Sequence, residues 1–161
     1  MSSIGRRGCA GFSILELVVA VAIIAVLAAA LLQSLRFVQR GAEKQAFNDA
    51  RSVIEGAVRH EALRRIADGQ AGNAAALQGS DPFQWMNPKL PGWAGAYPVG
   101  GKAAPGAWYW HGSAAQVVYF PKNPDHVDFH DAGAREIRLR LEVTADGSGA
   151  RLLPVTRFAW R

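Results

Sequence analysis

The feature that most constrains this chain is an uninterrupted apolar run near its N-terminus. Residues 17–32 carry no charged or polar side chain, and extending the run back to Phe12 adds only Ser13 and Glu16. At about 1.5 Å per residue, a helix over residues 12–32 covers roughly 30 Å, the thickness of the hydrocarbon core of a bilayer. We therefore expect residues 12–35 to form a membrane-spanning helix; the alternative is a buried core helix of a soluble domain.

The residues before this run distinguish an anchor from a cleaved secretory signal. A secretory signal has an apolar stretch of about 7 to 15 residues, followed by a cleavage site of small residues. Here the small residues GCAG at 8–11 precede the run, so a cut there would leave the apolar segment on the protein. Cys9, the only cysteine, has no apolar stretch in front of it, which disfavours lipid attachment. Arg6 and Arg7 favour a cytoplasmic N-terminus, with the rest of the chain outside the inner membrane.

The sequence stays compatible with a helix beyond the apolar run. Residues 33–69 contain no proline, and apolar side chains recur at steps of three and four, as in an amphipathic helix. These side chains are Leu35, Val38, Ala42, Ala46, Ala50, Val53, Ile54, Ala57, Val58, Ala62 and Ile66. We expect one helix from about Phe12 to about Ala67, in which the part over residues 36–68 is amphipathic and packs on a small domain.

Three glycines lie within the predicted helix or just after it. Gly41 and Gly56 lie inside it, at a cost of about 1 kcal/mol each relative to alanine, and are candidate points of bending or close approach. Gly69 follows the last periodic residues and is the predicted C-terminal stop.

A connector rich in glycine, proline and small residues is predicted from residue 69 to residue 106. The tripeptides DPF, NPK, LPG and APG mark turns within it. Trp85, Trp93 and Tyr97 argue that the connector is partly ordered, because bare aromatic side chains would leave a large apolar area in water.

The last third of the chain predicts a small antiparallel sheet over residues 107–161. Strand character is found at 107–111, 115–120, 136–144 and 150–160. In EIRLRLEVT at 136–144 apolar and polar residues alternate, so one face is expected to be buried and the other exposed. Pro154 suits the last strand best at an edge of the sheet. The expected fold class is α+β, with a long N-terminal helix packed on this sheet.

One cluster of candidate metal ligands is present, DHVDFHD at 125–131. In an extended segment, His126, Asp128 and His130 would share one side, and Asp125 and Asp131 would lie on the other. Three such ligands suit zinc, and aspartates joined by backbone carbonyls suit calcium. The favoured interpretation is a solvated loop between strands, because nothing in the spacing fixes a coordination geometry.

The sequence shows no recognisable motif of catalytic residues. The chain beyond residue 11 has no cysteine nucleophile, no phosphate-binding glycine loop with a lysine and no HExxH. The 16 basic and 13 acidic side chains from Phe12 onward give a net charge of +3, which is too small to indicate nucleic-acid binding. We expect neither enzymatic activity nor a cofactor. The aromatic WYW at 108–110 would suit a sugar- or base-stacking platform, but packing into the core and under the connector is favoured.

Residues 6–32, RRGCAGFSILELVVAVAIIAVLAAALL, resemble the class III signal of bacterial type IV pilins and type II secretion pseudopilins. The shared pattern is a short basic leader ending in glycine, then phenylalanine, then a hydrophobic helix with glutamate as its fifth residue. Here these positions are Gly11, Phe12 and Glu16. The resemblance implies a leader at 1–11, cleavage between Gly11 and Phe12 by a prepilin peptidase, and N-methylation of Phe12.

The resemblance also implies partners and a location. Before assembly, the subunit would be a single-pass protein of the inner membrane with a periplasmic domain at 36–161. An inner-membrane assembly platform would then insert it into a filament of pilin or pseudopilin subunits. A carboxylate in a bilayer costs on the order of 2.5 to 3.5 kcal/mol on insertion scales. In the family, the glutamate is thought to pair with the methylated amine of a neighbouring subunit. The alternative is that Glu16 merely snorkels to the interface.

The sequence departs from the pattern of many major pilins. It has no proline in the first helix and no C-terminal cysteine pair, which favours a pseudopilin or a minor, pilin-like subunit. Type IV pili, mannose-sensitive haemagglutinin-type pili and type II secretion all remain open as the filament system. The alternative function is a signal-anchored binding module for a sugar or metal.

Overall fold

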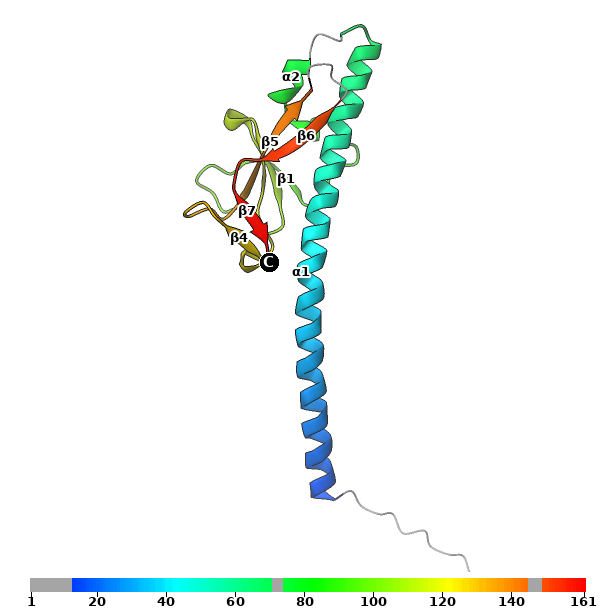
Figure 1. Cartoon of the computed structure of the whole chain (residues 1–161), viewed down its shortest axis with the longest axis vertical. Coiled ribbons are helices and arrows are strands. Elements are labelled where there is room, and N and C mark those ends of the chain that lie inside the picture. Colours follow the sequence, from blue (N-terminus) through cyan, green and yellow to red (C-terminus); the bar gives the residue numbers. More distant parts are fainter. Residues whose placement is uncertain (1–12, 71–73, 145–148) are drawn as a thin grey trace, which may run out of the picture. The chain divides into compact units, whose positions relative to one another are not determined.

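The computed structural model describes residues 13–70, 74–144 and 149–161, without the side chains of 36–40, 74 and 75 (Figure 1). The chain divides into two compact units, Met1–Gln39 and Arg40–Arg161. The helix α1 spans Ile14–Ala67 and belongs to both units. The predicted helix is confirmed from Ile14 onward, while Gly11, Phe12 and the predicted leader lie outside the described residues.

The C-terminal end of α1 confirms the predicted stop at Gly69. Gly69 has φ +77°, and its N–H donates to the carbonyl of Ile66 at 3.1 Å. The N–H of Gln70 donates to the carbonyl of Arg65 at 2.8 Å. These two bonds satisfy carbonyls that the end of a helix would otherwise leave unpaired, and glycine takes the left-handed conformation without a Cβ clash.

The main sheet has five strands in the order β1-β2-β3-β5-β6. Its strands are β1 (Trp93–Ala96), β2 (Trp108–His111), β3 (Gln116–Tyr119), β5 (Ile137–Val143) and β6 (Ala150–Pro154). All neighbours pair antiparallel except β1 and β2, which are parallel. The expected α+β class is therefore confirmed, with a sheet that is mostly rather than wholly antiparallel.

The predicted strand over residues 150–160 is wrong as a single element. The backbone N–H groups of Val155 and Thr156 donate to the carbonyl of Arg138, and the Thr156 hydroxyl accepts from the Arg138 N–H at 3.1 Å. These bonds bend the chain after β6. Beyond the bend, β7 (Phe158–Trp160) pairs with β4 (Val127–Phe129) in a second, two-stranded sheet.

Both edges of the main sheet carry features that disfavour pairing with a further strand. Pro154 lies on the edge strand β6, as predicted, and the N–H of Leu152 in that strand donates to Glu55 Oε1 on α1 at 2.7 Å. At the other edge, Gly95 has φ +95° and the pairing of β1 with β2 shifts register. A shift of this kind interrupts the row of backbone groups that another strand would need.

Over residues 74–106 the connector forms regular elements and buries aromatic side chains, in agreement with the predicted partial order. It contains α2 (Ala74–Gln78), a 3₁₀ turn η2 (Pro82–Trp85) and the unpredicted strand β1. The Asp81 carboxylate caps the 3₁₀ turn by accepting from the Phe83 N–H at 2.9 Å. Phe83 is fully buried and stacks on Trp93, with the two ring centroids 3.8 Å apart.

The core of the second unit lies between one face of α1 and the main sheet (Figure 1). Phe47 is its aromatic centre, with ring centroids 5.4 Å from Trp108 and 5.3 Å from Tyr119. The helix contributes further buried residues at Ala50, Ile54, Val58 and Ala62, and the sheet contributes Val117, Ile137, Leu139, Leu141 and Leu152. These buried apolar side chains supply most of the favourable free energy of folding of the unit.

The buried face of α1 coincides only in part with the predicted apolar stripe. Ala42 and Val53 of the predicted stripe are exposed, whereas Glu43 and Glu61 are buried. The large side chain of Phe47 enters the core and sets which face of the helix meets the sheet. A period of 3.6 residues identifies a face only to within the width of the apolar stripe.

Candidate functional site

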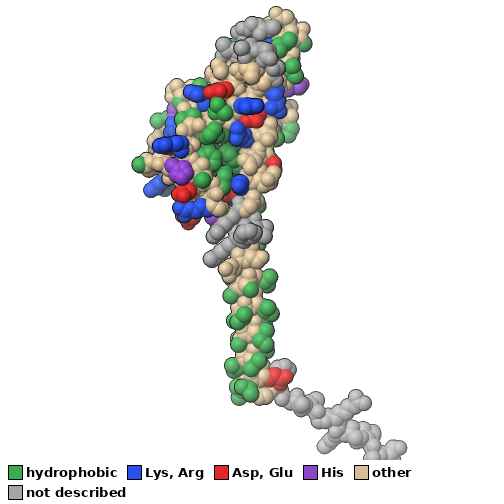
Figure 2. Space-filling view, in the orientation of Figure 1, with side chains coloured by type: hydrophobic (Ala, Val, Ile, Leu, Met, Phe, Trp, Pro, Cys, Tyr) green, Lys and Arg blue, Asp and Glu red, His purple; other side chains and the backbone are tan. Residues whose placement is uncertain are grey.

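The N-terminal part of α1 is an apolar surface without a covering in the described chain. The most apolar 18-residue window of Ile14–Leu35 has a mean hydropathy of 2.9, and none of it is buried. Figure 2 shows hydrophobic side chains over this segment. Ile14 is 82% exposed and Leu31 70% exposed. Such a surface is stable in a bilayer or against other apolar helices, so this segment is compatible with a single-pass membrane anchor.

Glu16 is the only charged residue of the segment Ile14–Leu35. It lies in the first turn of α1 and its side chain is exposed. Ser13 precedes the helix, and its hydroxyl accepts from the Leu15 N–H at 3.3 Å while its carbonyl accepts from the Leu17 N–H at 3.1 Å. Glu16 therefore projects at the positive end of the helix dipole, where a carboxylate is favoured.

A second acidic group, Glu43, joins α1 to the sheet within the unit Arg40–Arg161. Its Oε1 atom accepts from the backbone N–H of Lys122 at 2.6 Å and from the Tyr119 hydroxyl at 3.2 Å. Its Oε2 atom lies 3.9 Å from Nδ1 of His126. Burial, followed by the Glu43 carboxylate, raises the pKa of Tyr119, so the hydroxyl keeps the proton that it donates.

The candidate metal ligands of the segment 125–131 do not converge. A 3₁₀ turn η4 (Pro124–His126) precedes β4, so the predicted extended alternation is wrong over this turn. His126 faces Glu43, Asp128 accepts from Arg161 at 3.1 Å, and the exposed His130 follows β4. In the part of the chain that the structure describes, no group of three or more His, Cys, Asp or Glu side chains is placed to hold a metal ion.

The aromatic triplet at 108–110 is divided between the two faces of the main sheet. Trp108 is 3% exposed and packs in the core with α1, as does the partly buried Trp110. Tyr109 lies on the other face, beneath the connector, where its hydroxyl accepts from the Ala104 N–H at 2.9 Å. The triplet is thus a packing element, as favoured from the sequence, and not a stacking platform.

A hollow of about 510 Å³ lies between the connector around Tyr97 and the turn at 132–136. The carboxylate of Glu136 is held there by Nε of Arg138 at 2.6 Å and by the Tyr97 hydroxyl at 3.1 Å. Burial and the Glu136 carboxylate raise the pKa of Tyr97, so its hydroxyl remains a donor. Sequence reasoning missed this hollow because its lining residues are far apart in the chain and form no local motif.

Comparison with known proteins gave a match that covers the N-terminal segment. A family model described as the prokaryotic N-terminal methylation motif matches residues 6–32. Neither the curated proteins nor the solved structures gave a match to this chain. The matched range contains Gly11, Phe12 and Glu16, the residues singled out in the sequence, and it ends within the exposed apolar segment of α1. Residues 6–32 of this chain are therefore a prepilin-type N-terminal methylation motif, the class III signal of type IV pilins and pseudopilins.

Proposed function

We propose that the chain is a structural subunit of a bacterial type IV pilus or of a type II secretion pseudopilus. The observation that carries the proposal is the methylation motif at 6–32, which overlaps an exposed apolar helix with one charged residue, Glu16. A prepilin peptidase cuts between Gly11 and Phe12 and methylates Phe12. The uncovered apolar surface of α1 is then held first by the inner membrane and later by the helices of other subunits.

Two observations support a structural role over the alternative of an anchored binding module for a sugar or metal. The aromatic triplet at 108–110 is used in packing, and the candidate ligands at 125–131 point to separate partners. The apolar segment, in contrast, is not buried by any other part of the described chain. In a filament it would be buried, because subunit helices pack their apolar surfaces against each other when they leave the bilayer.

The pairing of Glu16 with a cationic amine accounts for its position. Cleavage after Gly11 creates an N-terminal amine on Phe12, which N-methylation leaves positively charged. A buried or half-buried carboxylate is stabilised by such a partner and destabilised without one. In this proposal the amine of one subunit meets Glu16 of its neighbour, so that the pair forms only on assembly.

Mass spectrometry of the membrane-extracted protein tests the proposal. The expected result is a chain that starts at N-methylated Phe12. A chain that starts at Met1 would contradict processing as a prepilin and support a plain signal anchor. We propose further that the subunit is a minor or pilin-like one, located in the inner membrane with its second unit in the periplasm. Detection of the protein in sheared pili or in a purified pseudopilus would identify the filament system.

A further inference from the structure

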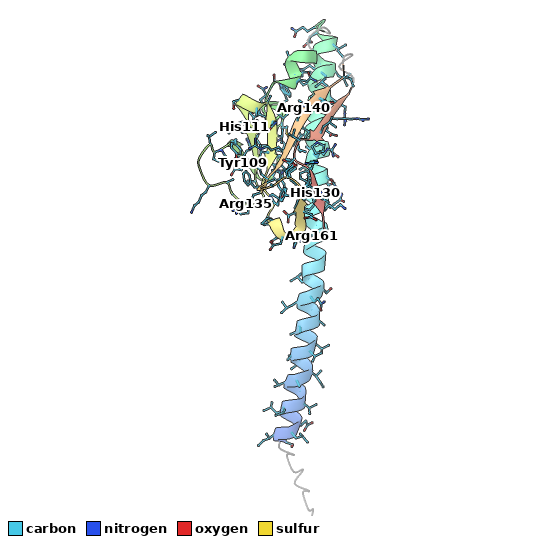
Figure 3. All side chains as sticks on the ribbon, turned by 60° about the vertical axis from the view of Figure 1, so that its left-hand side comes forward. Tyr109, His111, His130, Arg135, Arg140 and Arg161 are labelled. Atoms are coloured by element: carbon cyan, nitrogen blue, oxygen red, sulfur yellow. The ribbon has the colours of Figure 1, made fainter. Side chains whose placement is uncertain are left out.

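The hollow beside Tyr97 is formed on the face of the main sheet that points away from α1. Arg138 lies between Ile137 and Leu139, both of which are buried in the core with the helix. Because successive side chains of a strand point to opposite faces, Arg138 projects from the other face. Figure 3 labels Arg135, at the turn that precedes β5, and Tyr109 and His111 on β2, which β3 separates from β5 in the sheet.

The lining of this hollow carries one positive charge in excess. Arg138 is already paired with Glu136, through Nε at 2.6 Å and through Nη2. Arg135 is exposed and makes no ion pair with any residue that the structure describes. Its guanidinium therefore has its donors available at the edge of the hollow. A guanidinium whose N–H donors are available favours a planar, bidentate acceptor such as a carboxylate.

The remaining lining is suited to a ligand larger than a carboxylate alone. A volume of about 510 Å³ falls in the range typical of sites for small molecules. The partly exposed rings of Tyr97 and Phe120 stack with centroids 6.2 Å apart and line one side, together with Pro98 and Ala103. Thr156 belongs to the same lining, and its hydroxyl accepts from the Arg138 N–H at 3.1 Å. A ligand that fits has an apolar face, several hydroxyl groups and one negative charge.

We propose that this hollow binds a hexuronic acid unit, a sugar that carries a carboxylate, with the carboxylate on Arg135 and the ring against Phe120. The polar groups of the lining closest in kind to the sugar hydroxyls are the Glu136 carboxylate, which also accepts from Tyr97 and Arg138, and the Arg138 guanidinium. A neutral hexose would leave the guanidinium without its acceptor. A bare carboxylate would leave the aromatic side of the hollow exposed to water. The proposal concerns the second unit alone and does not depend on the filament proposed above.

The test is an amide NMR titration of the full chain in a zwitterionic detergent whose headgroup is not a sugar. The probes are methyl β-D-glucuronide, methyl β-D-glucoside, acetate and N-acetyl-glutamate amide at constant ionic strength. We expect saturable shifts with glucuronide at the amides of residues 132–138 and 97–103. We expect the other three probes to bind about tenfold more weakly or worse, since a charge-assisted hydrogen bond or the ring contact is lost in each.

Two matched variants locate the site. Arg135→Gln removes the guanidinium of an exposed residue, and we expect it to weaken glucuronide binding about tenfold with the spectrum otherwise unchanged. Arg140→Gln removes another exposed arginine, which Figure 3 shows well apart from Arg135, and we expect no effect. The proposal is overturned if glucuronide gives no saturable shift, or if acetate or the glutamate derivative binds as well. Equal weakening by both variants would also overturn it, because it would show a general charge effect.

Discussion

The backbone N–H of Lys122 donates a hydrogen bond of 2.6 Å to the carboxylate of Glu43, 79 residues earlier in the chain. Tyr119 donates a second bond to the same oxygen at 3.2 Å. Glu43 is only 9% exposed and lies on the buried face of α1. One helix carboxylate thus joins α1 to the end of β3 and the loop that follows it. A buried charge of this kind is tolerated because its partners are fixed in place.

Replacement of Glu43 by alanine is expected to lower the free energy of unfolding by about 2 to 4 kcal/mol, because the buried Tyr119 hydroxyl and the Lys122 N–H lose their acceptor. Glu43→Gln keeps an acceptor oxygen and is expected to have a smaller effect. Urea unfolding of the full chain in detergent, followed by tryptophan fluorescence, measures both. The control is Lys44→Ala, a change at the exposed neighbour on the same helix, with an expected effect within about 0.5 kcal/mol. An equally small effect of Glu43→Ala would contradict the joining role.

The stability of the second unit is expected to fall in acid through Glu61. This carboxylate is nearly buried and accepts from Arg64 and Arg65 at 2.8 Å. The hydrogen bond from Arg64, followed by that from Arg65, lowers the pKa of Glu61 from 4.5 to about 2, although burial opposes the shift. Because the folded-state pKa is the lower one, the stabilisation is present above the unfolded-state pKa and is lost as the pH falls from 4.5 through about 2.

Glu61→Gln removes this titration, so its urea midpoint should depend less on pH than that of the parent between about pH 6 and pH 3. Glu142→Gln, a change in an exposed pair with Arg140, serves as the control and should leave the pH dependence as it is. If the Glu61 variant and the parent lose stability in parallel over this range, Glu61 is not the group responsible.

Two glycines, one inside α1 and one just beyond its end, are expected to respond to alanine in opposite directions. Gly69→Ala places a Cβ at φ +77° and should destabilise the unit by about 1 kcal/mol. Gly56→Ala lies in the helix interior, where the new Cβ would meet only Arg59 Nη2 at 3.9 Å, and should stabilise by up to about 1 kcal/mol. The same unfolding measurement tests both. Destabilisation by Gly56→Ala would indicate packing at this position that the described residues do not show.

The elements that depend on local sequence were predicted well. The helix follows from its apolar composition and period, and its end follows from Gly69. In β5, Ile137, Leu139 and Leu141 are buried while Arg140 is exposed, as the alternation predicts. The methylation motif is likewise local, so its residues can be identified from their order and spacing alone.

The features that depend on distant partners could not be predicted in the same way. The burial of Glu43 could not be predicted, because the groups that make it tolerable, the Tyr119 hydroxyl and the Lys122 N–H, lie 76 and 79 residues later in the chain. The strand β1 contains Gly95 and has little strand character of its own, and it forms by pairing with β2. Pro124 begins a 3₁₀ turn that removes the expected alternation of the candidate metal ligands. The hollow at Tyr97 combines four separate segments, which no single motif describes.

Glu16 provides the most direct test of the proposed assembly. Neutralising it in Glu16→Gln or Glu16→Ala lowers the cost of placing the first turn of α1 in a bilayer, so the variants should insert and be processed normally. Their incorporation into filaments should fall by about tenfold or more, the factor that corresponds to about 1.4 kcal/mol of lost pairing with the amine of Phe12. Immunoblots of sheared filaments and membrane fractions measure the two pools, and mass spectrometry confirms cleavage. Gln33→Ala, at the other end of the exposed segment, is the control and should be incorporated normally. If the Glu16 variants reach the filament in parental amounts, the carboxylate has no pairing role and its place at the helix N-terminus is explained by the helix dipole alone.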